Sequence, residues 1–398
     1  MFHFFPDNYP WSQAALRILF TGGSIGEVGP AMVALAEASA AGDDDAWSRV
    51  WLGHANRLSG RAAAQAEAGH SLSARDGYLR AYAYYQWASI FQDHDDPARL
   101  DAHRRSVEAF GAFARLSNPP IERLEIPYEG SSYPAWLIPP TDAKGRRPVA
   151  IYLPGWESSK EQGIEFGLDL ARRGIGVLLC DGPGIGEAVL FRGLVNRHDY
   201  EVPVKAAVDF LAARPDVKPE RIAVVGSSMG GYRAARAAAF EPRLAAAVAW
   251  GAIWDYGAIW RRRLERGSVL TAPMSHALAV MGATDVSEFA RIMEAWTLEG
   301  VAGGIRCPLL VVHGERDVQI PLDDAIRLYE EASSTVKELK VFTAEEGGAA
   351  HCQNDNRILA QQYIGDWLVD VLVAGRQRGG AFDRLDSAPR LTTARGRG

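Results

Sequence analysis

The chain has 398 residues, of which 47% are hydrophobic and 23% charged, and its formal net charge is −6 at pH 7. This length allows two domains, or one large domain with an appendage, and the composition supplies ample apolar material for a core. The mildly negative charge argues against a nucleic-acid-binding protein, which needs a basic surface. It also gives no reason to expect binding to an anionic membrane.

The cysteines and the apolar runs indicate where in the cell the protein is located. The three cysteines, Cys180, Cys307 and Cys352, are odd in number and far apart, so we expect no disulfide framework. The first residues, "MFHFFPDNYPW", lack a basic region followed by a long apolar stretch, so we expect no signal peptide. No apolar run reaches the roughly 18 residues that a membrane span needs. We therefore expect a soluble, cytoplasmic protein.

The first region of the chain, residues 1–118, is predicted to be a helical domain. Its apolar and aromatic positions recur at spacings of three and four residues. Pro119 and Pro120 end this region because neither can continue a helix. Two short strands around a Gly-Ser-Ser turn are expected next, over residues 121–140.

The second region, residues 119–375, alternates short apolar runs with amphipathic stretches. Runs that are almost continuously apolar predict parallel strands buried on both faces, and the alternation predicts an α/β fold with a doubly wound, mostly parallel sheet. Residues from about 253 to 304 are too many for a simple crossover and are predicted to form a helical lid. Residues 376–398 are poor in apolar side chains and are predicted to be disordered. The expected strands of the main sheet lie at residues 148–155, 174–182, 221–228, 245–252, 308–315 and 338–346.

The stretch Gly226-Ser227-Ser228-Met229-Gly230 fits the pattern G-x-S-x-G. A chain with 40 glycines can contain this pattern by chance, so its context decides. Here an apolar strand precedes it and an alanine-rich helix follows, which is the setting of a nucleophile elbow. Larger side chains at the two glycines would collide across the tight turn. We predict that Ser228 is a nucleophile, the alternative being a passive serine in a glycine-rich turn.

A serine hydroxyl needs a base, and the order Ser, Asp or Glu, His along the chain is that of α/β-hydrolases. Asp317 directly follows an expected strand, and His351 lies beyond the last one. Both are at carboxyl ends of strands, where open α/β sheets bind ligands. We predict that His351 accepts the proton of Ser228 and that Asp317 fixes its tautomer. The competing acidic residues and histidines are Glu315, Asp323, Asp324, His313 and His276.

An oxyanion needs donors, and two backbone N–H groups are candidates. Met229 directly follows the nucleophile, and Trp156 lies in the loop "LPGWESS" after an expected strand. The alternative is that this loop is only a strand-ending turn. The segment "CDGPGIGE", residues 180–187, lacks the glycine spacing of a dinucleotide fingerprint and is predicted to be a structural turn. We therefore expect neither a cofactor nor a metal.

Several stretches together resemble a known group: "LPGWESSKE", "DGPGIGE", "GSSMGGYRAARAAAFEPRLAAAVAWGA", "HGERD" and "HCQND". They are similar to the α/β-hydrolases that include the dihydroxypseudooxynicotine hydrolases and the fungal pigment hydrolases that shorten polyketides. The segment "HANRLSGRAAAQAEAGHSLSARDGYLRAYAYYQWASIF" looks like the helical domain that precedes the hydrolase core in this group. The resemblance implies hydrolysis of a carbon–carbon bond beside a ketone through an acyl-enzyme, on a β-diketone or an acylated polyphenol. It also implies a homodimer.

The resemblance further implies an acidic residue near the lid, for which both Asp255 and Glu265 are available. Trp254 and Tyr85 are candidates for substrate contacts, although aromatic residues of helices more often belong to the core. The partner would be a small-molecule ketone or ester. The triad alone is equally compatible with a carboxylesterase, a thioesterase or an exopeptidase. A binding module without catalytic activity is the third alternative.

Overall fold

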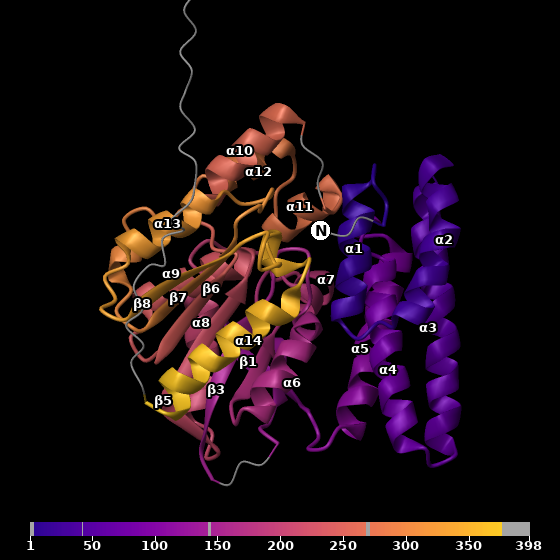
Figure 1. Ribbon diagram of the computed structural model, residues 1–398, viewed down its shortest axis with the longest axis horizontal. Coiled ribbons are helices and arrows are strands. Elements are labelled where there is room, and N and C mark those ends of the chain that lie inside the picture. Colours follow the sequence, from indigo (N-terminus) through magenta and orange to yellow (C-terminus); the bar gives the residue numbers. More distant parts are fainter. Residues whose placement is uncertain (1–3, 42, 142–144, 268–270, 376–398) are drawn as a thin grey trace, which may run out of the picture.

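The structure is a computed structural model that describes residues 4–41, 43–141, 145–267 and 271–375 (Figure 1). The tail predicted to be disordered, residues 376–398, lies outside the described residues, as do three residues of the expected lid, 268–270. Within the described part, none of the helices is long and apolar enough to cross a membrane.

Five helices precede the sheet and lie side by side next to it (Figure 1). Side-chain caps define where three of them begin, including α3 (Asp44–Glu67), whose cap Asp43 accepts a hydrogen bond from the N–H of Ala46. The side chain of Asn8 accepts a hydrogen bond from the N–H of Trp11, and Asp96 accepts one from Ala98, directly after Pro97 at the first helical position. The helical character predicted for this region is confirmed. The five helices are α1 (Tyr9–Phe20), α2 (Ile25–Ala41), α3 (Asp44–Glu67), α4 (Ser71–Ala88) and α5 (Pro97–Leu116).

The sheet has eight strands in the order β1-β2-β4-β3-β5-β6-β7-β8. The first two strands form an antiparallel pair, and β2 pairs antiparallel with β4, whereas the remaining neighbours are parallel. The predicted fold class, a mostly parallel doubly wound sheet, is confirmed. The strands are β1 (Glu122–Tyr128), β2 (Ser131–Ile138), β3 (Arg147–Leu153), β4 (Gly176–Cys180), β5 (Val217–Ser227), β6 (Ala246–Trp250), β7 (Leu309–Gly314) and β8 (Lys337–Phe342).

Further helices cover the sheet or stand above its end. Figure 1 shows α10, α11 and α12 grouped above one end of the sheet, in the region predicted to be a lid. The α-helices are α6 (Ile164–Arg172), α7 (Gly186–Arg192), α8 (Glu201–Ala212), α9 (Met229–Phe240), α10 (Tyr256–Arg266), α11 (Met274–Met281), α12 (Val286–Met293), α13 (Leu322–Glu331) and α14 (Arg357–Leu368). Short helical turns are η1 (Lys160–Gly163), η2 (Ala302–Gly304), η3 (His351–Gln353) and η4 (Val369–Val373).

Both faces of the central strand β5 are buried. Ala223 and Val225 belong to the core shared with the N-terminal helices, whereas Ile222 and Val224 belong to the core on the opposite face. This alternation follows from the two-residue period of a strand and explains the nearly continuous apolar run. The end of β5 is therefore a rigid platform for the residue that follows it.

Candidate active site

Ser228 lies at the turn between β5 and α9, with φ 57° and ψ −122°. Non-glycine residues rarely adopt a positive φ, and such strain is retained where the surrounding structure enforces it. A Cβ atom on Gly226 would lie 1.7 Å from the carbonyl oxygen of Gly230, and one on Gly230 would lie 2.0 Å from that of Leu153. The two glycines are thus sterically required, and the turn holds the side chain of Ser228 at the carboxyl end of the sheet.

Replacing Gly230 by alanine is expected to lower the free energy of unfolding by about 1–3 kcal/mol or more, because backbone atoms must move to accept the methyl group. Chemical denaturation followed by circular dichroism measures this. Gly60, inside α3, is the matched control, since nothing lies within 4 Å of a Cβ added there. Gly60→Ala is expected to raise the free energy of unfolding by about 0.5–1 kcal/mol. Equal effects of the two substitutions would contradict the steric account.

Three side chains from separate loops meet at this turn. His351, in η3 beyond β8, places its Nε2 atom 2.8 Å from the Oγ atom of Ser228. Its Nδ1 atom lies 2.6 Å from Oδ2 of Asp317, which follows β7. The other carboxylate oxygen of Asp317 accepts hydrogen bonds from the N–H groups of Gln319 at 2.8 Å and Ile320 at 3.0 Å. The three residues predicted from the sequence are therefore connected in the order Ser228, His351, Asp317.

Burial and the charge of the Asp317 carboxylate together set the pKa values in this relay. Burial by itself lowers the pKa of His351, but the neighbouring Asp317 outweighs this effect, and the pKa is raised to about 10. The pKa of Asp317 would be raised by its own burial, yet the facing imidazole keeps it below its usual value. Asp317 therefore stays ionised and strengthens His351 as a proton acceptor.

The competing residues make other contacts. His313 is buried, with its Nε2 atom 3.1 Å from the carbonyl oxygen of Ile320 and 3.6 Å from Oδ2 of Asp317. Glu315 and Asp324 accept hydrogen bonds from backbone N–H groups, and Asp323 is exposed in the first turn of α13. His276 lies in α11, where it contacts His94 and Arg99. Asp317 is the carboxylate that the fold brings to His351.

Both candidate oxyanion donors lie close to Ser228. Met229 begins α9 directly after it, and a Cβ on Gly155 would lie only 3.4 Å from Cβ of Ser228, which places the loop that carries Trp156 against the nucleophile. The buried guanidinium of Arg233 donates to the carbonyl oxygen of Pro154 at 2.9 Å and so holds this loop. The role of the two N–H groups in binding an oxyanion stays a prediction.

A buried cluster fixes the other end of the same loop. The ammonium group of Lys160 lies 2.7 Å from carboxylate oxygens of both Glu161 and Asp181 and 2.5 Å from one of Glu187. These three carboxylates are close enough to hold a metal ion, but Lys160 already occupies their centre. Asp181 also accepts hydrogen bonds from the backbone N–H groups of Lys160 and Glu187. The segment "DGPGIGE", for which the sequence predicts a structural turn, thus supports the loop beside Ser228.

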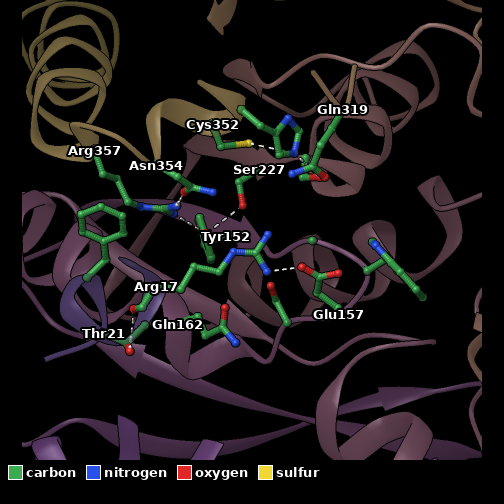
Figure 2. Close-up of a pocket in the computed structure, with 16 residues that line it drawn as sticks. Arg17, Thr21, Tyr152, Glu157, Gln162, Ser227, Gln319, Cys352, Asn354 and Arg357 are labelled. Atoms are coloured by element: carbon green, nitrogen blue, oxygen red, sulfur yellow. Dashed lines mark hydrogen bonds and ion pairs between the residues drawn. The ribbon is translucent and has the colours of Figure 1, made fainter. Parts of the chain in front are cut away.

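A small cavity, partly open to solvent, adjoins the triad. Its wall comes from α1, from residues 155–158, and from the segment between His351 and Arg357. Figure 2 shows the side chain of Arg17 extending toward Glu157, and that of Arg357 extending toward Asn354 and Tyr152. The helical lid contributes to the neighbouring hollow at α10, where the lining residues include Arg262 and Arg263.

The four proposed substrate-contact residues are not among those that line this cavity, and their contact with a substrate stays a prediction. Trp254 packs beneath an arginine of α13 at 4.5 Å, and Asp255 caps α10 by accepting the N–H of Ala258 at 2.8 Å. Glu265 is exposed on α10, and Tyr85 donates a hydrogen bond to a side chain of α3. Trp254, Asp255 and Tyr85 thus have structural partners, which the pattern of the sequence does not reveal.

Three charged residues that line the cavity were not identified from the sequence. Glu157 lies directly after Trp156, inside a stretch that the sequence analysis quotes, and forms an ion pair with Arg17 of α1. Arg357 begins α14, six positions after His351. The proximity of Glu157 and Arg357 to predicted site residues was a usable signal. Arg17 offered none, because its helix is far from the triad in the sequence.

Comparison with known proteins agrees with the fold. The family model described as the prolyl oligopeptidase family matches residues 170–374. The 2,6-dihydropseudooxynicotine hydrolase of Paenarthrobacter nicotinovorans is 31% identical over 83% of this chain and 86% of its own length. The hydrolase acrC of Aspergillus aculeatus is 30% identical over 78% of this chain and 83% of its own.

A solved structure shows that the similarity holds for the three-dimensional fold as well. The crystal structure of the 2,6-dihydroxy-pseudo-oxynicotine hydrolase superposes with a TM-score of 0.80 at 28% identity, covering 92% of this chain and 98% of that one. The match therefore includes the N-terminal helices as well as the sheet. The chain is a hydrolase with the α/β-hydrolase fold, and it belongs to the prolyl oligopeptidase family.

Proposed function

We propose that this enzyme hydrolyses a carbon–carbon bond beside a ketone, with Ser228 as the nucleophile. The observation that carries the proposal is the hydrogen-bonded relay from Ser228 through His351 to Asp317 at the edge of a cavity. The curated relative named as a 2,6-dihydropseudooxynicotine hydrolase supports a small organic molecule as the substrate.

The reaction would run in two halves. The Oγ atom of Ser228 attacks the ketone carbon while Nε2 of His351 takes its proton, and the N–H groups of Met229 and Trp156 hold the oxyanion. The carbon–carbon bond then breaks, its electron pair leaves with the departing carbon, and His351 protonates that carbon. In the second half, His351 accepts a proton from water as the water attacks the acyl-serine ester. An acid is released, and Ser228 recovers its proton.

The departing carbon limits the substrate class. A carbanion is a poor leaving group unless its charge is delocalised, as in an enolate or a phenol-activated ring. A β-diketone or an acylated polyphenol meets this condition, and a simple ketone does not. The proposal therefore includes a place in polyketide or aromatic metabolism.

Two further parts of the proposal concern the cellular location and the oligomeric state of the enzyme. We propose a cytoplasmic location, which the three free cysteines support, because disulfides are rare in reducing compartments. We also propose a homodimer, which rests on the resemblance alone. Sedimentation at several protein concentrations tests the dimer, and a monomer throughout would contradict it.

A substrate panel tests the reaction itself. The purified enzyme is incubated with a series of β-diketones and acylated polyphenols, and separately with p-nitrophenyl acetate, and the products are identified by mass spectrometry. The proposal expects an acid and a ketone from each β-diketone that is cleaved. Rapid ester turnover with every diketone and acylated polyphenol intact would contradict carbon–carbon cleavage and favour an esterase. A fluorophosphonate that leaves Ser228 unlabelled would contradict nucleophilic catalysis altogether.

A further inference from the structure

Two arginines reach the cavity, and one of them is neutralised. Arg17 forms an ion pair with Glu157, whose side chain is only 3% exposed. The second carboxylate oxygen of Glu157 accepts a hydrogen bond from Thr271. Both oxygens of Glu157 are thus engaged, and the Arg17–Glu157 pair adds no net charge to the cavity.

The other arginine, Arg357, has neutral partners. Its guanidinium donates to the hydroxyl of Tyr152 at 3.3 Å and to the amide oxygen of Asn354 at 3.4 Å (Figure 2). It also lies 4.4 Å from the centre of the Trp250 ring. Within the described residues, no carboxylate lies within 4 Å of Arg357. Glu165 acts on Arg357 from farther away, and burial raises the pKa of Glu165 to about 7, so that this carboxyl is only partly ionised near neutral pH.

An unpartnered donor belongs to the same wall. The Nε2 atom of Gln162 is buried and has no hydrogen-bond partner in the described part of the chain, and Gln162 lines the cavity. A buried donor without an acceptor costs about 1–3 kcal/mol, so a ligand that offers an acceptor would stabilise this side chain. Two cations and one carboxylate line the cavity, which leaves one positive charge when His351 is neutral.

We propose that Arg357 binds an ionised oxygen of the substrate, a carboxylate or an ionised phenol, so that the enzyme selects acidic substrates over neutral ones of the same shape. The inference rests on the proposed function, whose substrate class it narrows. The guanidinium offers a fork of donors that matches such an oxygen acid, and Gln162 supplies a further donor in the same wall. The link from Arg357 through Tyr152 to the hydroxyl of Ser227, at 2.9 Å, places this charge next to the nucleophile turn.

The structural alternative is that Arg357 only braces the cavity wall through Tyr152 and Trp250. Such a role would affect acidic and neutral ligands equally. A preference for acidic over neutral ligands therefore distinguishes a role of Arg357 in substrate recognition from a purely structural role.

The experiment measures binding in the Ser228→Ala variant, which cannot turn the ligands over, by titration calorimetry. One pair of ligands is a β-diketone with a pendant carboxylate and the same molecule with a carboxamide. A second pair is an acylated phenol and its methyl ether. The first pair tests recognition of a carboxylate, and the second tests recognition of an ionised phenol. We expect the acidic member of at least one pair to bind about 10- to 100-fold more tightly, which is the range for a hydrogen bond to a charged group.

Substitutions then assign the selectivity to Arg357. In Arg357→Gln the preference is expected to fall to less than about 3-fold, and in Arg357→Lys part of it is expected to remain because the charge is kept. Arg173→Gln is the matched control, since Arg173 forms an ion pair with Asp366 of the same helix α14 from outside the cavity. This control is expected to keep the full preference.

Equal affinity for the acidic and neutral members of both pairs would overturn the inference, as would a preference that survives in Arg357→Gln. Either result leaves the proposed function standing if the parent enzyme cleaves the neutral diketone. Conversely, the parent enzyme could leave every diketone intact while the Ser228→Ala variant binds the acidic ligand selectively. This result would contradict the proposed reaction and support the anion site.

Discussion

Alanine in place of Ser228 is expected to lower kcat by about 10⁴- to 10⁶-fold, because no side-chain oxygen remains to attack the substrate. The fold is expected to persist, since the hydrogen bond from the N–H of residue 228 to the carbonyl of Trp250 at 2.8 Å involves only backbone atoms. Turnover of the best diketone or ester from the panel, together with a thermal melt, measures both effects.

The neighbouring serine is the control for this prediction. Ser227 also lines the cavity, and its hydroxyl shares a hydrogen bond of 2.9 Å with Tyr152. Ser227→Ala removes one hydrogen bond of about 1 kcal/mol, so a loss of no more than about 10-fold is expected. Comparable losses for the two serines would contradict the assignment of Ser228 as the nucleophile.

Asparagine in place of Asp317 is expected to lower kcat by about 10⁴-fold with little change in structure. Asp317 accepts a hydrogen bond from Nδ1 of His351 at 2.6 Å, which leaves Nε2 free to accept the proton of Ser228. An amide can present its NH₂ group instead and so favour the wrong tautomer. Rates at saturating substrate, with circular dichroism as the check on folding, measure this loss. A variant that keeps more than a tenth of the parent kcat would contradict the relay.

The pH dependence gives a second readout of the same contact. The Asp317 carboxylate raises the pKa of His351 to about 10 against the effect of burial, and only the neutral imidazole acts as a base. kcat/KM of the parent is therefore expected to rise with pH, with an acid limb above the usual histidine pKa of about 6.5. Asp317→Asn removes the charge that raises the pKa, so the limb is expected to move to lower pH. A limb at or below about 6.5 in the parent, unmoved in the variant, would contradict this account.

The strands and the triad could be predicted because their signals are local. The apolar runs that form β3 to β8 show directly in the sequence, and glycine spacing marks the turn at Ser228. The order of Asp317 and His351 then follows from the ends of two neighbouring strands, β7 and β8. Each inference needed only a short stretch and the geometry of a parallel sheet.

The charged wall of the cavity could be predicted only in part, because it is assembled from distant segments. Arg17 reaches the cavity from α1 through its ion pair with Glu157, a contact between residues 140 positions apart. Conversely, Asp255 and Glu265 were candidates only for their place near the lid. In the structure one caps α10 and the other is exposed, roles that depend on helix boundaries rather than on residue type.

The central claim, that Ser228 carries the acyl group after carbon–carbon cleavage, is tested most directly by rapid quenching. The enzyme is mixed with a β-diketone that it cleaves, stopped with acid within one turnover, digested, and analysed by mass spectrometry. The account predicts that the peptide containing Ser228 gains the mass of the acyl fragment, while the released ketone is already present. Cleavage of the diketone with no acylated Ser228 at any quench time would contradict it.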